Sequence, residues 1–199
     1  ITVGPVVFFA LVALGFWLLT RPAFGEDNCK IGEDPEAVWA VLFDVTDKYR
    51  DVPIGEFETN TLINGVKNRF DDLMNDLPEH ARLEMWVLGN AGVTSEPVES
   101  LCNPGGQVST PLEWFYRNPR LRKERWQSEF AAKLDKAFDE AFTEGESAQS
   151  PILEQIKETV VAGLNSVTGV PRKLIVVSDF MQKTSGLDHY KGVPNFRDF

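Results

Sequence analysis

Apolar runs of strand length mark out the chain, and two of them stop abruptly at acidic residues. Residues 37–44, AVWAVLFD, are apolar at successive positions up to Asp44, which favours a central strand covered on both faces. Residues 172–179, RKLIVVSD, end in the same way. A third run, residues 81–89, ends in a glycine turn, and Pro97 suits the short stretch after it to an edge strand. The pattern therefore predicts four strands.

Three segments between these strands repeat their apolar residues at helical spacing. Residues 59–77 do so until Pro78 stops the pattern, and Ser150 and Pro151 open the last of the three as N-cap and first turn. In residues 120–142 the repeat is Trp126, Phe130, Leu134, Phe138 and Phe142. We interpret this stripe as core-facing, with a partner-binding stripe as the alternative. The alternation of strands and helices predicts an α/β domain with an open, mainly parallel, doubly wound sheet and helices on both faces.

The first segment of the chain differs from all the others. Residues 1–20 carry no charge and are long enough to cross a hydrocarbon core as one helix, with Trp17 near the polar end as an interfacial aromatic. A cleavable signal peptide is the main alternative, because residues 23–25, AFG, have the small-x-small pattern of a cleavage site. A buried core helix is the third interpretation. We expect a retained transmembrane anchor.

Length and net charge limit which classes of protein residues 21–199 can belong to. The 199 residues suit one domain plus an appendage, and we expect a linker at residues 21–35 and the α/β domain at 36–199. The tail lacks a further strand and helix, so the domain either continues beyond Phe199 or is trimmed there. All 20 basic and 30 acidic residues follow residue 20, which leaves that part with a net charge of −10. This balance argues against binding to nucleic acid or to anionic lipid, because both repel an acidic surface.

The thiols and imidazoles are few and scattered. Cys29 and Cys102 do not form a CxxC pair, and His80 and His189 are isolated, so the spacing does not support a zinc site. In an exported domain the two cysteines would form one disulfide. The alternative is two unrelated thiols.

The acids at the strand ends carry a resemblance. In an open α/β sheet, ligands bind beyond the carboxyl ends of the strands. Here the chain resembles a von Willebrand factor A-like domain, in which Asp-x-Ser-x-Ser, a Thr and a later Asp hold a divalent cation, usually Mg²⁺. Asp44 and Thr46 stand at the first two positions, Ser150 at the Thr position and Asp179 at the last. Lys48 replaces the second Ser, and its ammonium group would oppose a cation.

The resemblance covers residues 36–180 and implies a function. It implies a non-catalytic protein-binding or scaffold subunit of a bacterial envelope complex, with protein partners and a degenerate Mg²⁺ site. We expect a single-pass protein of the inner membrane with its domain in the periplasm. A degenerate site would leave Thr46 and Asp47 as caps of a turn. An assembly subunit without any ligand is a further interpretation.

Enzymatic alternatives are weaker. A Mg²⁺-dependent hydrolase or phosphatase on a similar sheet is the main competing class. Haloacid-dehalogenase-like phosphatases carry Asp-x-Asp-x-Thr after the first strand, and Thr46 stands where the second Asp is needed. The phosphate-binding patterns GxxxxGK[ST] and GxGxxG do not occur in the sequence. We therefore expect a protein without catalytic activity.

Overall fold

The four apolar runs form one sheet. The structure is a computed structural model that describes residues 24–46, 56–105, 119–144 and 147–191. In these ranges no helix is both long and apolar enough to cross a membrane, and the anchor expected at residues 1–20 lies outside them. Lys48 and Asp47 also lie outside the described residues.

The sheet is mixed and mostly parallel. Its strands, in the order β3-β2-β1-β4, are β1 (Val38–Asp44), β2 (Arg82–Leu88), β3 (Glu99–Cys102) and β4 (Arg172–Val177). Strand β1 pairs parallel with both β2 and β4, and β3 pairs antiparallel with β2. The expected α/β fold with an open, mainly parallel sheet is confirmed, as is the edge position of the strand that follows Pro97.

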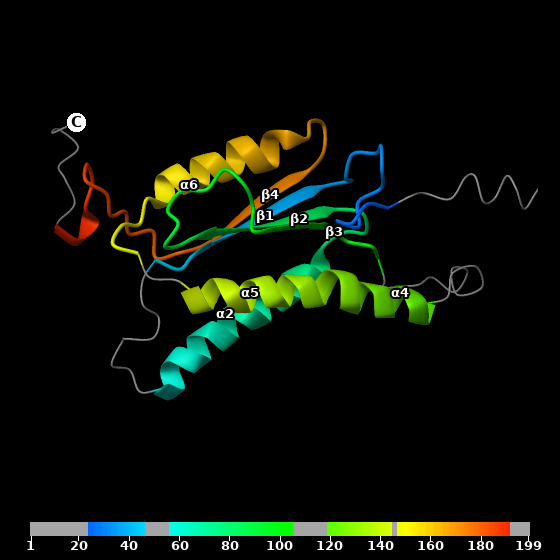
Figure 1. The fold of residues 1–199 in the computed structure, drawn as a ribbon, viewed down its shortest axis with the longest axis horizontal. Coiled ribbons are helices and arrows are strands. Elements are labelled where there is room, and N and C mark those ends of the chain that lie inside the picture. Colours follow the sequence, from blue (N-terminus) through cyan, green and yellow to red (C-terminus); the bar gives the residue numbers. More distant parts are fainter. Residues whose placement is uncertain (1–23, 47–55, 106–118, 145–146, 192–199) are drawn as a thin grey trace, which may run out of the picture.

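Helices cover both faces of the sheet (Figure 1). On one face lie α2 (Glu56–Asp76) and α5 (Ala132–Glu144), and on the other lies α6 (Ile152–Glu158). The helix expected over residues 120–142 is interrupted, since α4 (Pro119–Arg125) leads into α5 through a π-helical turn, Trp126–Ala131. Short turns complete the described part: π-helical Thr159–Gly163 and 3₁₀ turns Leu164–Ser166 and His189–Lys191.

Each face of the sheet has its own core. On the α2/α5 face, Phe43 meets Phe70 and Phe138 edge-on, with ring centroids 5.4 and 5.3 Å apart. Phe130 and Leu134 of the aromatic stripe are completely buried there, which confirms that the stripe faces the core. The α6 face is packed by the alternate residues of the strands together with helical residues: Val38, Ala40, Leu42, Trp86, Leu88, Ile152, Leu164 and Val167.

The segment before β1 is bonded to the sheet at the end where β2 begins and β3 ends. Cys29 and Cys102 form a disulfide, with their Cα atoms 4.9 Å apart, so the expected bond is confirmed. The Cys102 N–H also donates to the Asp27 carbonyl at 2.8 Å. Asn28 is buried and donates to the Glu129 carbonyl at 3.2 Å. We call residues 24–30 the N-terminal clasp.

Candidate functional site

Asp44 lies at the carboxyl edge of the sheet, where the sequence pattern places it. Strands β1 and β4 are parallel neighbours, so their carboxyl ends meet at one edge. The Asp44 side chain is nearly buried, at 5% exposure. Its Oδ1 accepts hydrogen bonds from the Thr46 hydroxyl at 2.7 Å and from the Thr46 N–H at 3.2 Å. Asp44 and Thr46 thus form a tight turn directly after the strand.

Two further hydroxyl groups reach the same carboxylate from distant parts of the chain. Ser178, directly after β4, donates to Asp44 Oδ2 at 2.8 Å. Ser150, just before α6, donates to the same oxygen at 3.2 Å. Ser150 is held there by a pair of backbone hydrogen bonds with Lys183, of 2.9 and 3.0 Å. Three separate segments therefore converge on one buried carboxylate.

Asp179, the last of the expected site residues, follows Ser178 directly. Its side chain is exposed, and its Oδ1 accepts the Met181 N–H at 2.8 Å. The neighbouring Ser178 donates to Asp44, and its oxygen also accepts the Phe180 N–H at 2.8 Å. The participation of Asp179 in the site stays a prediction.

The cluster offers only oxygen atoms. Carboxylate and hydroxyl oxygens are ligands that Mg²⁺ and Ca²⁺ accept. A hydroxyl group has one proton and two lone pairs, so Thr46, Ser150 and Ser178 can donate to Asp44 and still face a cation with a lone pair. Among the described residues, no group of three or more His, Cys, Asp or Glu side chains is placed to hold a metal. The oxygen atoms of the cluster are therefore the type of ligand that a hard cation accepts. The cluster supplies only the single negative charge of Asp44.

The two histidines lie apart. The Nδ1 atom of His189 accepts the Gln182 N–H at 3.2 Å, near the C-terminal end of the described chain. His80 stacks on Phe24 of the N-terminal clasp, with ring centroids 6.3 Å apart. Each imidazole thus belongs to a different end of the sheet, and neither is positioned beside Asp44 in the described contacts.

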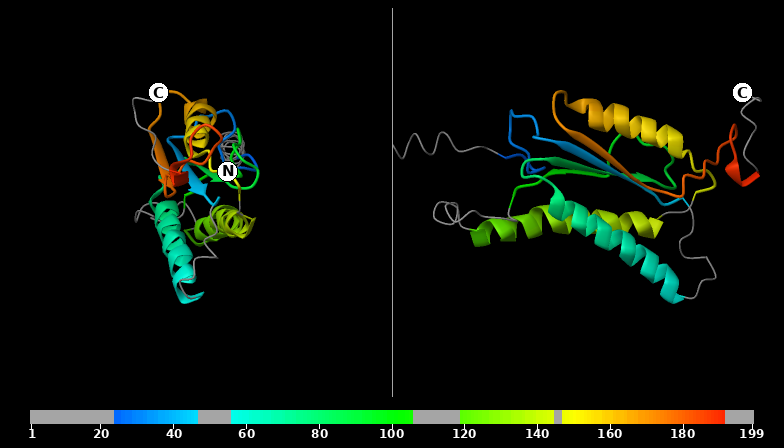
Figure 2. Two further views of the ribbon diagram at one scale, coloured as in Figure 1. Left: turned by 90° about the vertical axis from the view of Figure 1, so that its left-hand side faces the viewer. Right: turned by 180° about the vertical axis from the view of Figure 1, so that it is seen from behind.

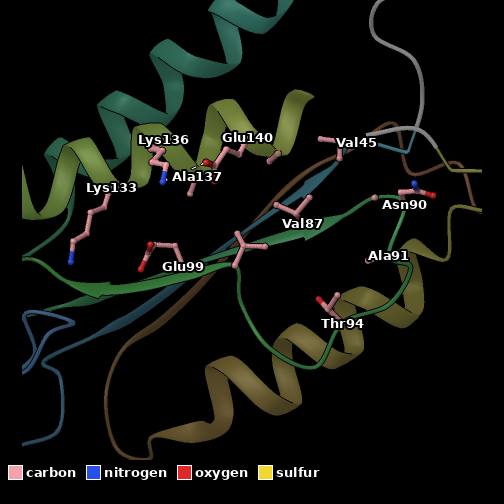
Figure 3. Close-up of a pocket in the computed structure, with 13 residues that line it drawn as sticks. Val45, Val87, Asn90, Ala91, Thr94, Glu99, Lys133, Lys136, Ala137 and Glu140 are labelled. Carbon is pink, nitrogen blue, oxygen red and sulfur yellow. Dashed lines mark ion pairs between the residues drawn. The ribbon is translucent and has the colours of Figure 1, made fainter. Parts of the chain in front are cut away.

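A pocket of about 550 Å³ lies between the end of β2, the loop of residues 89–98 and α5 (Figure 3). Val45 and Val87 contribute apolar wall, and Lys136 and Glu140 of α5 line the other side, where they form an ion pair of 3.6 Å. Val45, the residue after Asp44, therefore borders this pocket. The sequence patterns did not predict the pocket.

Gln155 of α6 fixes the loop that lines one side of this pocket. Its side chain is fully buried and forms two hydrogen bonds with the backbone of Thr94, accepting from the N–H at 2.8 Å and donating to the carbonyl at 3.0 Å. A polar residue in an apolar helical repeat was the only sequence signal for this contact. The contact explains why a loop rich in Gly, Ser and Pro has a defined position beside the sheet.

These observations define an α/β protein with an open four-stranded, mostly parallel sheet and a hydroxyl-lined carboxylate at the carboxyl edge. Comparison of the chain with protein-family models, with curated proteins and with solved structures gives no match.

Proposed function

We propose that this chain is a non-catalytic protein-binding or scaffold subunit of a bacterial envelope membrane complex, and that its partner docks at the carboxyl edge around Asp44. The observation that carries the proposal is the convergence of the Thr46, Ser150 and Ser178 hydroxyls on the Asp44 carboxylate. The order β3-β2-β1-β4 with antiparallel β3 supports a von Willebrand factor A-like arrangement. The Cys29–Cys102 disulfide suits an oxidising compartment such as the periplasm.

The same proposal assigns a divalent cation, Mg²⁺ by preference, to this edge. The cation would sit above Asp44, with hydroxyl oxygens and water as further ligands and Asp179 within reach of the outer shell. A partner carboxylate would complete the coordination, so the protein binds an acidic side chain through the metal. One carboxylate and neutral hydroxyl groups give a modest affinity for the cation. The cation would then be held firmly only when the partner carboxylate also binds it.

We expect Mg²⁺ to raise the thermal unfolding midpoint of the wild-type protein. A cation that binds only the folded state stabilises it by about 2.7 kcal/mol at a concentration of about 100 Kd. Asp44→Asn keeps the size of the side chain and removes its charge, so the Mg²⁺ effect should disappear. Asp72→Asn, at an exposed position of α2, is the matched control and should retain it. An unfolding midpoint of the wild type that Mg²⁺ leaves unchanged would contradict the cation part of the proposal.

The docking part has its own test. Purification from native membranes should recover a protein that accompanies the wild type and the Asp72→Asn variant but not Asp44→Asn. Equal recovery with all three would place the partner elsewhere.

Phosphatase assays with Mg²⁺ on the same three proteins test the competing class, a Mg²⁺-dependent hydrolase. Hydrolysis that is lost only in Asp44→Asn would favour that class.

A further inference from the structure

Strand β2 is longer than its neighbour β3, so part of its edge has no described strand beside it. The antiparallel register pairs Met85 with Glu99 and ends there, while β2 runs on to Leu88. Continued by two residues, the same register would set Val87 opposite Pro97. Proline has no N–H and cannot donate to a ladder. The pairing therefore stops one rung short of Val87.

The backbone of Val87 faces this open part of the edge. The Leu88 carbonyl accepts the Val45 N–H at 2.9 Å, so even-numbered residues of β2 direct their backbone groups toward β1 and odd-numbered residues direct theirs to the other side. The carbonyl of odd-numbered Met85 accordingly accepts the Val98 N–H at 2.8 Å. Within the described ranges, no hydrogen bond joins the N–H or C=O of Val87 to another residue. One complete rung of the ladder is thus open.

The pocket of about 550 Å³ adjoins this rung. Val87 lines it on the sheet side, and Ala137 and Ala141 line it on the α5 side (Figure 3). Figure 2 shows α5 and α6 on opposite sides of the sheet, and Gln155 of α6 bonds the loop of residues 89–98 through its two contacts with the backbone. The loop is therefore held toward α6, and the space between the sheet edge and α5 stays open.

We propose that this pocket receives an extended, uncharged peptide segment of the docking partner, which pairs antiparallel with β2 at Val87 and places one apolar side chain against α5. One residue of an antiparallel strand exchanges two hydrogen bonds with the residue opposite, so it would satisfy the N–H and the C=O of Val87 together. Side chains of two residues paired in this way lie on the same face of the sheet. Val87 packs on the α5 face, so the side chain of the partner residue enters the pocket.

Charge and position select this occupant. The pocket is lined by two basic and two acidic residues, Lys133, Lys136, Glu99 and Glu140. Their charges cancel, which favours a neutral segment over an anion or a cation. Val45 follows Asp44 directly and lines the same pocket, so the segment would adjoin the edge at which the partner is proposed to dock. The inference rests on the proposed function in that the partner is a protein, and it does not require the cation.

Hydrogen exchange at single amides tests the pairing. The full chain is kept in detergent with a chelator, and the probe is the acetylated and amidated tripeptide serine-leucine-serine. In the free protein, the Val87 amide should exchange faster than the amides of Trp86 and Leu88, which face β1. At about ten times its Kd, the tripeptide should slow exchange at Val87 about tenfold, because exchange then occurs only from the free fraction.

The matched control is the same tripeptide methylated on the leucine nitrogen. It cannot donate to the Val87 carbonyl and should leave the exchange unchanged. A methylated tripeptide that protects Val87 equally well would overturn the proposal. So would a Val87 amide that is as protected as its neighbours without any peptide. Such protection at every protein concentration would mean that another segment of this chain fills the rung, and protection that grows with concentration would mean that a second copy does.

A change of the pocket wall tests where the side chain goes. Ala141→Phe puts a ring into the pocket from α5 and should raise the Kd of the tripeptide about tenfold or more. Ala162→Phe, the same change at an exposed position beyond α6, should leave the Kd unchanged. Equal binding of the tripeptide to both variants would place its side chain outside the pocket and overturn the proposal.

Recovery of the partner from native membranes separates this inference from the proposed function. Loss of the partner in both Ala141→Phe and Asp44→Asn, with retention in Ala162→Phe, would support both. Loss in Asp44→Asn alone would leave the docking proposal standing and overturn this inference. Tripeptide binding at Val87 together with a partner that Asp44→Asn still recovers would support the peptide site and contradict docking at Asp44.

Discussion

Replacement of Cys29 and Cys102 together by alanine should lower the free energy of unfolding by about 4 kcal/mol. The bond joins residues 73 positions apart, and it restricts the unfolded chain much more than the folded one. A loss of this size is a large part of the stability of an ordinary domain. Denaturant unfolding at equilibrium measures it, with the disulfide-intact wild type as the reference.

The native contacts of the N-terminal clasp explain why the loss should arise mainly in the unfolded state. The Cys102 N–H bonds to the Asp27 carbonyl, and Asn28 accepts from Arg125 Nη2 at 3.2 Å without help from the sulfur atoms. We therefore expect the double variant to retain the native fold. Asn28→Ala in the disulfide-bonded protein is the control for the clasp itself and should cost only about 1 kcal/mol per hydrogen bond lost. A double variant as stable as the wild type would show that residual structure in the unfolded chain already provides the restriction.

The strand ends could be predicted from sequence because burial and pattern agree there. The run that ends at Asp44 is apolar on both faces, and a central strand with a helix layer on each side requires that. Thr46 reaches the expected carboxylate from the turn directly after β1, and Ser150 reaches it while held by its backbone pair with Lys183. The sequence reasoning singled out Asp179 and missed the adjacent Ser178, whose hydroxyl donates to Asp44. One residue of register decides this, and composition does not encode it.

Other features depend on tertiary contacts that no local pattern reveals. The π-helical turn at Trp126–Ala131 divides a helix whose four-residue repeat looks uninterrupted in the sequence. Gln155 is a polar residue in an apolar helical repeat, and only its contact with Thr94 explains it. The position of β4 at the edge of the described sheet is likewise a property of strand order, which the sequence predicts only as an alternation of elements.

Arg82→Met should destabilise the protein strongly because it leaves Glu84 buried without its cation. Glu84 is 4% exposed, its Oε1 lies 2.8 Å from Arg82 Nη2, and its Oε2 accepts the Trp86 Nε1–H at 3.2 Å. The turn above it comes so close that a Cβ at Gly163 would collide with the Glu84 carboxylate. Breaking such a pair from one side costs about 3–5 kcal/mol.

The pH dependence identifies the cause. Burial raises the pKa of Glu84, and Arg82 and Trp86 only partly oppose this. Below the unfolded-state pKa the group is protonated in both states and burial has no electrostatic cost. As the pH rises through the folded-state pKa, Glu84 ionises inside the protein and the stabilisation relative to the unfolded chain is lost. Arg82→Met removes the opposing positive charge, so the folded-state pKa of Glu84 should rise further in this variant. The destabilisation that the variant causes should therefore grow from acidic to neutral pH.

Denaturant unfolding over that pH range measures both effects. Arg82→Met/Glu84→Gln removes the buried charge while keeping an oxygen for Trp86, so it should recover most of the stability and show a flatter pH dependence than Arg82→Met. Arg82 also donates to the Ser166 hydroxyl, and Ser166→Ala gives the separate cost of that contact. If Arg82→Met lost the same stability at acidic and neutral pH, packing of the arginine side chain and not the charge of Glu84 would account for the effect.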